Sequence, residues 1–81
     1  MLSEIDLTDN ELRNDGVYEL SNFKKLNNLS ILKLNSNHIE ARGLDYLRKC
    51  YFKTTLTYLD LSNNTIEKEG IDILSRCGFK S

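Results

Sequence analysis

The residues that could carry catalytic or metal chemistry are few in this sequence, and their spacing does not combine them. His38 is the single histidine, and it lies between Asn37 and Ile39 in a polar stretch where an exposed loop side chain is the simplest interpretation. No nucleophile lies at a spacing that pairs it with a base, and no two histidines or cysteines have the spacing of a metal site. The glycines do not cluster into a phosphate-binding loop. The sequence therefore predicts a protein that is not an enzyme and that holds no cofactor or metal.

The two cysteines, Cys50 and Cys77, are 27 residues apart, and Phe23 occupies the position 27 residues earlier. Exchange of cysteine with phenylalanine is typical of a buried core position. Neighbouring helices pack about 8–10 Å apart, whereas a disulfide requires Cα atoms about 4.4–6.8 Å apart. We therefore expect reduced, buried and unreactive thiols, with a disulfide as the alternative. Because free thiols are typical of reducing compartments, we also expect a cytoplasmic protein.

One pattern accounts for nearly the whole chain. Leu2, Leu29 and Leu56 each open a segment of the form Leu-x-x-(Leu/Ile)-x-Leu-x-x-Asn-x-(Leu/Ile), and a glycine follows in register in each segment. The pattern asparagines and glycines are Asn10, Asn37 and Asn64, and Gly16, Gly43 and Gly70. A period of this length is the signature of a repeat protein. We therefore divide a single domain, 1–81, into the repeats 2–28, 29–55 and 56–81.

The residues within each repeat predict a strand followed by a helix. Apolar and polar residues alternate from Ile5 to Leu7 and at the equivalent positions of the other repeats, which is typical of a strand with one buried face. Apolar residues then recur at every third position, as one stripe of a short helix. These stripes are Val17, Leu20 and Phe23; Leu44, Leu47 and Cys50; and Ile71, Leu74 and Cys77. We expect strands near 4–8, 31–35 and 58–62, and helices near 15–24, 41–51 and 68–77.

These motifs resemble the leucine-rich repeat family, and its long-repeat, ribonuclease-inhibitor-like class in particular. The resemblance implies an α/β solenoid of three strand-turn-helix repeats, with a parallel three-stranded sheet on the concave side and helices on the convex side. Within that fold we expect the pattern asparagines to form a buried ladder rather than a ligand site, because an amide side chain both donates and accepts hydrogen bonds. We expect the pattern glycines to let helix and strand come close.

The resemblance also implies a binding surface, because the concave face of the family's sheet is commonly where protein partners bind. The outward strand positions form four rows, which are Glu4, Ile31 and Tyr58; Asp6, Lys33 and Asp60; Thr8, Asn35 and Ser62; and Asp9, Ser36 and Asn63. Ile31 and Tyr58 form an apolar pair with two open interpretations, an interface anchor or cross-strand packing for stability alone. The row of Asp6, Lys33 and Asp60 is a candidate charge ladder.

Composition narrows the class of partner. A formal net charge of −1 gives no general attraction to nucleic acid or to an anionic membrane, and no apolar run approaches the roughly 18 residues that span a bilayer. We therefore expect a protein partner, and neither nucleic acid nor membrane. The outward positions are fewer than the about 20–30 residues that one side of a standard interface uses. Either the partner also contacts loops or an edge, or binding is weak, or the chain is part of a longer array.

The ends of the repeat stack lead to a second expectation. The first repeat begins at Leu2, and we expect the sheet edges at Leu2–Leu7 and Leu59–Leu61 to lack the polar capping units that close other solenoids. Open edges favour pairing with another chain, so we expect a homo-oligomer or a fragment of a longer repeat array. Three functions stay open: a protein-protein interaction module, which we favour; a self-assembling structural module; and, from the roles of relatives, a regulator of an enzyme such as a small GTPase or nuclease.

Overall fold

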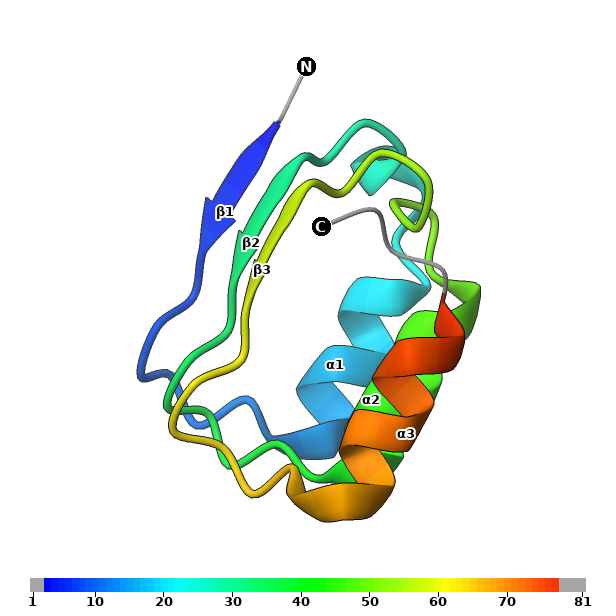
Figure 1. Cartoon of the computed structure of the whole chain (residues 1–81). Helices are drawn as coiled ribbons and strands as arrows, with labels where there is room; N and C mark the ends of the chain where they lie inside the picture. Colours follow the sequence, from blue (N-terminus) through cyan, green and yellow to red (C-terminus); the bar gives the residue numbers. More distant parts are fainter. Residues whose placement is uncertain (1–2, 78–81) are drawn as a thin grey trace.

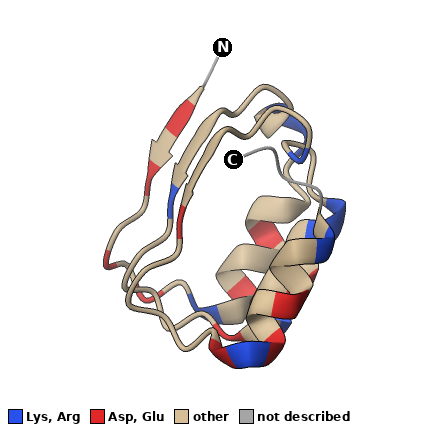
Figure 2. Ribbon diagram, in the orientation of Figure 1, with Lys and Arg blue, Asp and Glu red and all other residues tan. Residues whose placement is uncertain are grey.

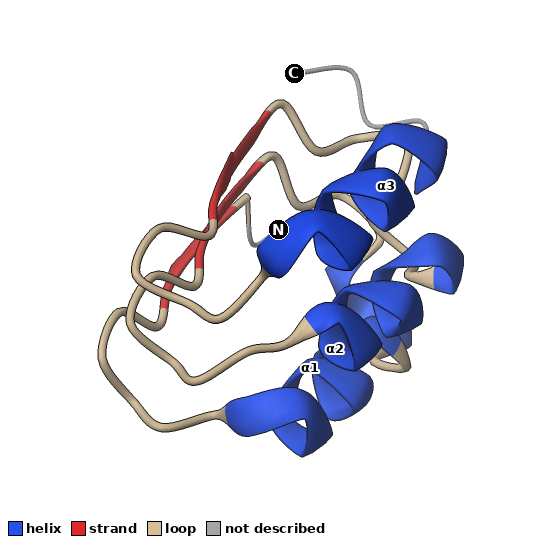
Figure 3. Cartoon of the chain, turned by 60° about the horizontal axis from the view of Figure 1, so that its bottom comes forward, coloured by secondary structure: helices blue, strands red, loops and turns tan. Residues whose placement is uncertain are grey.

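The computed structural model describes residues 3–77 as three coils, each with a strand, a helix and, between successive coils, a return loop (Figure 1). The elements are β1 (Glu4–Asp6), α1 (Arg13–Ser21), β2 (Ile31–Lys33), α2 (Ala41–Tyr46), β3 (Tyr58–Asp60) and α3 (Glu67–Cys77), with single-turn 3-10 helices η1 (Lys24–Leu26) and η2 (Leu47–Lys49). The sheet forms one layer and the helices form the other (Figure 3). The repeat positions Leu2 and 78–81 lie outside the described residues.

The three strands form one parallel sheet in the order β1-β2-β3, as the repeat predicts. Ile31 of β2 lies between Glu4 of β1 and Tyr58 of β3, so equivalent positions of successive repeats are neighbours. The same register continues along the strands for the two rows that follow. Each coil is therefore a translated copy of the one before it, and two of the predicted rows, Glu4, Ile31 and Tyr58 and Asp6, Lys33 and Asp60, are rows of the sheet.

The strands are three residues long, shorter than expected. The expected ranges are 4–8, 31–35 and 58–62. Bonding of the strand type continues past each end, since the N–H of Asp9 donates to the carbonyl of Asn35 and the N–H of Ser36 to that of Ser62, both at 3.0 Å. The chain then turns, because Asp9, Ser36 and Asn63 have positive φ angles of 58°, 60° and 56°. One backbone conformation, repeated in register, therefore ends every strand.

The helices lie close to the expected ranges, which are 15–24, 41–51 and 68–77. α1 begins two residues early and ends at Ser21, and α3 begins one residue early. α2 ends at Tyr46, where the backbone tightens into η2 and the N–H of Cys50 donates to the carbonyl of Leu47 at 3.3 Å. The sequence thus locates each helix but overestimates how far the first two continue.

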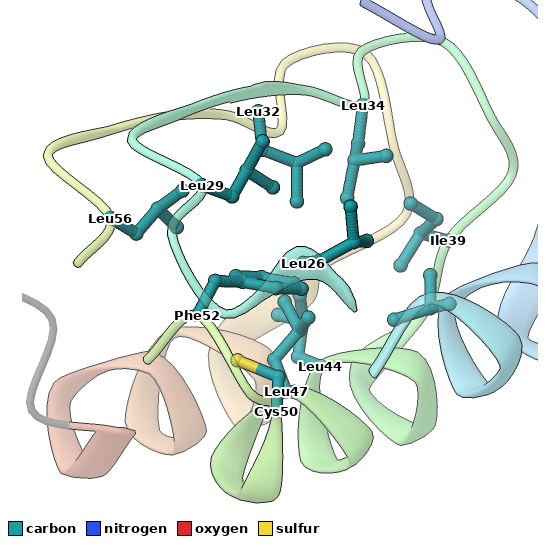
Figure 4. Packing of buried hydrophobic residues seen from close by; sticks show 11 residues of the cluster. Leu26, Leu29, Leu32, Leu34, Ile39, Leu44, Leu47, Cys50, Phe52 and Leu56 are labelled. Carbon is teal, nitrogen blue, oxygen red and sulfur yellow. The ribbon is translucent and has the colours of Figure 1, made fainter. Parts of the chain in front are cut away.

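The core lies between the sheet and the helices and is centred on the second coil (Figure 4). Leu32 and Leu34 enter it from the strand side, Leu44 and Leu47 from the helical side, and Phe52 from the return loop, and all five are fully buried. Alternation along β2 places leucine inside and its neighbours outside. The equivalent strand residues of the first and third coils are only half-buried, so burial is deepest in the middle.

Phe23 is not a core residue, contrary to the prediction from its register with the two cysteines. Its side chain is 52% exposed, because α1 ends at Ser21 and the backbone turns into η1, where Leu26 fills the interior instead. Ile71, which the helical stripe places in the core, is 61% exposed. Ile71 lies on the face of α3 that points away from α2, and within the described residues no further helix packs on that face.

The pattern glycines bring neighbouring helices together, and not helix and strand as predicted. A Cβ atom on Gly43 would lie 2.6 Å from Oδ1 of Asn14 in α1. A Cβ atom on Gly70 would lie 3.1 Å from Cδ1 of Leu44 in α2. The absence of a side chain at these positions therefore sets the close spacing of the helical layer.

Charged side chains divide between the two ends of the coils (Figure 2). The segments 21–30, 46–57 and 73–77, where helices end and return loops run, contain Lys and Arg but no Asp or Glu. This basic edge consists of Lys24, Lys25, Arg48, Lys49, Lys53 and Arg76. The opposite edge, where strands turn into helices, holds Asp9, Glu11, Asp15, Glu40, Glu67 and Glu69 together with Arg13, Arg42 and Lys68. Acidic residues outnumber basic ones there, so we call it the acidic edge. A net charge of −1 therefore conceals two edges of opposite sign.

Candidate functional site: the concave face of the sheet

The candidate site is the sheet face that points away from the helices, which we call the concave face. None of the twelve predicted positions is buried. Those that are exposed are Glu4, Asp6, Thr8, Asp9, Tyr58, Ser62 and Asn63, and those that are half-buried are Ile31, Lys33, Asn35, Ser36 and Asp60. The parallel register holds the first two rows side by side on the sheet, and hydrogen bonds between successive coils, such as Thr8 to Asn35 and Ser36 to Ser62, continue past the strand ends into the other two.

Ile31 and Tyr58 are direct neighbours on β2 and β3. Tyr58 is 49% exposed and Ile31 is half-buried, so the pair presents apolar surface to water. Cross-strand packing accounts for their contact, but it leaves about half of the tyrosine uncovered. The pair can therefore contact a partner while it also stabilises the sheet.

Two carboxylates on the concave face are each held by a hydroxyl residue two positions later. Oδ1 of Asp6 accepts from the Thr8 N–H at 3.0 Å and from the Thr8 hydroxyl at 2.5 Å. Oδ1 of Asp60 accepts from the N–H and hydroxyl of Ser62 at 3.0 and 2.7 Å. These bonds lower the pKa of both aspartates, and the charge of Lys33 contributes less to each pKa. Both carboxylates are therefore charged and oriented at neutral pH.

Lys33 lies between these carboxylates in the register, yet the row is not a ladder of ion pairs. The ion pairs found within residues 3–77 join Arg13 to Glu11 at 3.7 Å and Arg48 to Asp45 at 2.8 Å, and neither is on the concave face. Each aspartate of the row is bonded within its own coil instead. The ammonium group of Lys33 therefore acts on the row through its charge and stays available to a partner.

The asparagine ladder fixes the coils that carry this face. Oδ1 of Asn37, which is buried, accepts from the N–H groups of Asn10 at 2.8 Å and Leu12 at 3.2 Å. Nδ2 of Asn37 donates to the Leu7 carbonyl at 2.8 Å. Asn64 repeats the arrangement one coil later, where it accepts from the N–H of Asn37 at 2.9 Å. Asn37 and Asn64 are thus bonded to backbone, as predicted, and each ties its own coil to the preceding one. The predicted burial holds only for Asn37, because Asn64 is half-buried and Asn10 is exposed and bonds within its own coil.

Sequence reasoning misses a second link between the first two coils. Asn14 is buried in α1, where its Oδ1 accepts from the N–H of Glu40 at 2.9 Å and its Nδ2 donates to Oε1 of Glu40 at 3.0 Å. The sequence offers one signal, because the equivalent positions hold Ala41 and Lys68, so this asparagine departs from the repeat. The link fixes the start of α2 against α1.

The reactive side chains of the described part of the chain are either spread apart or line a polar surface hollow, which Asp15, His38 and Glu40 share with Arg13 and Arg42. Cys50 and Cys77 are buried, as predicted, and desolvation raises the pKa of Cys50 to about 11 and that of Cys77 above its ordinary value. His38 is exposed in a loop, where its φ angle is 57°. Across residues 3–77, no group of three His, Cys, Asp or Glu is placed to hold a metal ion. None of the helices in that range has the length and apolar character to cross a membrane.

Comparison with known families agrees with the three stacked coils. The family model described as leucine-rich repeat matches residues 1–21, 25–47 and 52–77, one match for each coil. The chain belongs to the leucine-rich repeat family. No curated protein and no solved structure matches it.

The family match and the parallel sheet together confirm the predicted α/β repeat fold. Leucine-rich repeats are in general protein-interaction modules and not enzymes. The ribonuclease-inhibitor-like class, which the 27-residue period favours, stays a prediction.

Proposed function

We propose that this leucine-rich repeat protein binds a protein partner on its concave face. The observation that carries the proposal is the half-exposed Tyr58 beside Ile31, on a surface that is otherwise polar. Tyrosine offers a large, rigid contact area and is a common anchor of protein interfaces. A partner that covers this pair with an apolar side chain removes apolar surface from water, at about 25 cal/mol per Å².

The polar groups around the pair favour a partner segment of mixed charge. Lys33 attracts a carboxylate, while Asp6 and Asp60 attract arginine, lysine or backbone N–H groups. Thr8 and Ser62 already hold these carboxylates in place. Binding therefore immobilises few additional rotamers on this side of the interface, which lowers its entropic cost.

Three short strands offer a small contact area, so the interface extends beyond them. The adjoining row of Asp9, Ser36 and Asn63 is fixed by the backbone turn that ends each strand, and it lies at the margin of the concave face. Contacts there add backbone and side-chain hydrogen bonds without reordering a loop. Regulation of an enzyme, such as a small GTPase or nuclease, is one form that such binding takes.

The proposed setting is the cytoplasm. Two buried thiols support it, since free cysteines are typical of reducing compartments. Neither thiol is on the concave face, so the redox state does not enter the proposed binding.

Photo-crosslinking followed by affinity measurement tests the proposal. A photoreactive phenylalanine analogue at position 58 captures and identifies the partner, and the dissociation constant of the purified partner is then measured for Tyr58→Ala. We expect binding to weaken by about thirtyfold, which corresponds to about 2 kcal/mol at an anchor residue. Tyr51→Ala is the matched control, since Tyr51 is similarly exposed (43%) but lies on a return loop. Equal effects of the two substitutions would contradict binding on the concave face.

A further inference from the structure

The two end faces of the coil stack differ from every internal contact. The N-terminal end face, formed by Leu7, Leu12, Gly16, Leu20 and Phe23, lines an apolar hollow of about 570 Å³. The C-terminal end face consists of half-buried or exposed apolar residues of the third coil, which are Leu59, Leu61, Ile66, Ile71 and Leu74. Leu61, Ile66 and Leu74 among them are equivalent to Leu7, Leu12 and Leu20. At the same positions the second coil is fully buried between its neighbours.

The hydrogen bonds of the ladder stop at these two faces in a complementary way. Oδ1 of Asn37 and Oδ1 of Asn64 each accept two backbone N–H groups from the preceding coil. Oδ1 of Asn10 accepts none from residues 3–77, and its Nδ2 bonds only within its own coil, to Thr8 at 3.1 Å. At the other end, no asparagine Oδ1 within that range accepts from the N–H groups of Asn64 and Ile66, as Asn64 does from those of Asn37 and Ile39. The first coil therefore offers the acceptor that the third coil lacks.

The side chains of the helical layer are complementary in the same direction. Leu44 packs into the space above Gly70 of the next coil, where a Cβ would lie 3.1 Å from its Cδ1. Ile71 is the residue equivalent to Leu44, and it is 61% exposed because no glycine of a following coil faces it within the described residues. Gly16 is equivalent to Gly70, and the atoms nearest to its missing side chain belong only to Leu12 of its own coil. The exposed side chain of Ile71 has a counterpart in the apolar hollow that Leu12 and Gly16 line.

We propose that a second copy of this chain stacks on the first, head to tail, with the C-terminal end face of one copy on the N-terminal end face of the next. Asn10 of one copy accepts from the N–H groups of Asn64 and Ile66 of the other, and Ile71 packs over Gly16. β3 of one copy pairs in parallel with β1 of the other. The occupant is a second copy because the third coil of this chain carries the same pattern, in the same register, as the coil that each internal face already holds.

Such a contact uses two different faces, so a dimer keeps one free face of each kind and further copies can add to form a polar array or a ring. It also continues the sheet from one copy to the next. The concave face of two stacked copies has twice as many strands, which brings it into the range of about 20–30 residues that a standard interface uses. The inference stands independently of the proposed partner binding, since it involves only the end faces.

A complementation experiment tests the polarity of the contact. Ile71→Lys disables the C-terminal end face and Phe23→Glu disables the N-terminal end face, and both residues are exposed, so the fold of each variant is expected to persist. In sedimentation, the unmodified chain should show dimers and longer species as concentration rises. Each variant alone should associate at least about tenfold more weakly. An equimolar mixture of the two should form dimers and stop there, because each dimer retains no working pair of faces.

Three outcomes would overturn the proposal. They are an unmodified chain that stays monomeric on the order of 100 µM, an Ile71→Lys variant that associates like the unmodified chain, and a mixture that stays monomeric. A monomeric unmodified chain would mean that the end faces contact segments other than those of a second copy. Normal association of Ile71→Lys would indicate that two N-terminal end faces pair with each other. Ile31→Ala serves as the control, since Ile31 lies on the central strand β2, between β1 and β3 of its own chain, and its truncation should leave association unchanged.

A second substitution tests the register. Head-to-tail stacking places Asp60 of one copy beside Asp6 of the other, two like charges without the intervening Lys33 that separates them within one chain. Asp60→Asn removes this repulsion and keeps an acceptor for Ser62, so it should strengthen association by a few-fold. Association that is unchanged or weaker in this variant would show that the strands do not pair in this register.

Discussion

The first and second coils carry the same sequence pattern but have different surroundings. Leu32, Leu34 and Ile39 of the second coil are fully buried, whereas their equivalents in the first coil, Ile5 and Leu7 among them, are half-buried. The residue types hardly differ between the coils, so the difference comes from the number of neighbours. In a repeat protein, the stability that a residue contributes depends on the coils stacked on either side of it as much as on the residue itself.

The same comparison applies to hydrogen bonds. Asn37 is buried and bonds through both atoms of its amide to three other residues outside its own turn, whereas Asn10 is exposed and makes one side-chain bond to its own coil. The same residue in the same motif is therefore expected to contribute much to the stability of one coil and little to that of another. Substitutions at paired positions can test how far this position dependence extends.

The largest expected contrast is between Leu44→Ala and Ile71→Ala. Leu44 is fully buried between α1 and α3, so its truncation leaves a cavity and should lower the free energy of unfolding by about 2–5 kcal/mol. Ile71→Ala should cost less than about 0.5 kcal/mol, because the exposed side chain fills no space in the monomer. Urea denaturation at a concentration where the chain is monomeric measures both. Similar losses at the two positions would show that burial in the second coil is not what stabilises it.

A smaller contrast is expected between Asn37→Ala and Asn10→Ala. Removal of the Asn37 amide leaves buried backbone groups without partners and should cost about 1–3 kcal/mol. Asn10→Ala should have a small effect, and so should His38→Ala, the exposed neighbour of Asn37. Urea denaturation measures the free energy of unfolding of the three variants. A loss of stability in Asn10→Ala as large as that in Asn37→Ala would refute the dependence on position.

The thiols should show a still smaller effect, which depends on pH. The pKa of Cys50 is about 11 in the folded chain against an ordinary value of 9.0, so the folded state holds its proton more tightly. Its stabilising contribution is therefore complete below pH 9 and is lost as pH rises toward about 11. Urea denaturation across this range should show a loss that is smaller in Cys50→Ala, which controls for the titration of lysine and tyrosine.

Thiol labelling gives a second measure of the same burial. Native protein should react slowly at both Cys50 and Cys77, and completely after denaturation, because each side chain is shielded by neighbouring residues. Rapid labelling of Cys77 alone would mean that the third coil opens more readily than the second.

The smallest expected effect concerns the carboxylates of the concave face. Thr8→Ala removes the hydroxyl that contributes most to the low pKa of Asp6, so this pKa should rise toward its ordinary value. The pKa of Asp60, which is set by Ser62, should stay where it is. Titration followed by NMR resolves the two groups, and a parallel rise in both would indicate that the row behaves as one coupled unit.

Periodicity in the sequence predicts the coils and their register well, because both depend on short patterns that repeat unchanged. It fails where a backbone turn decides the outcome. Phe23 shares its register with two buried cysteines, but the helix ends two residues before it and the side chain points outward. The strands end early for a similar reason, since the positive φ angles at Asp9 and its equivalents involve no glycine and leave no clear signal in the residue types.

The candidate site is predictable in its placement and less so in its bonding. Alternation accounts for the first three rows; the fourth row, Asp9, Ser36 and Asn63, follows the third directly and does not alternate with it. It does not show that Asp6 and Asp60 bond to Thr8 and Ser62 rather than to Lys33, because that depends on side-chain reach within the coil. Asn14 is missed altogether, since its partner Glu40 is in another repeat and the pattern does not require either residue.

The division of charge between the two edges makes the molecule an electric dipole, although its net charge is only −1. A charged protein that approaches within the Debye length, about 8 Å at physiological salt, exerts a torque before it makes contact. An acidic partner turns the basic edge, with Lys24 and Lys53, toward itself and so arrives from the side of the return loops. Orientation of this kind raises the association rate at low salt and leaves the dissociation rate, which the final contacts control, nearly unchanged.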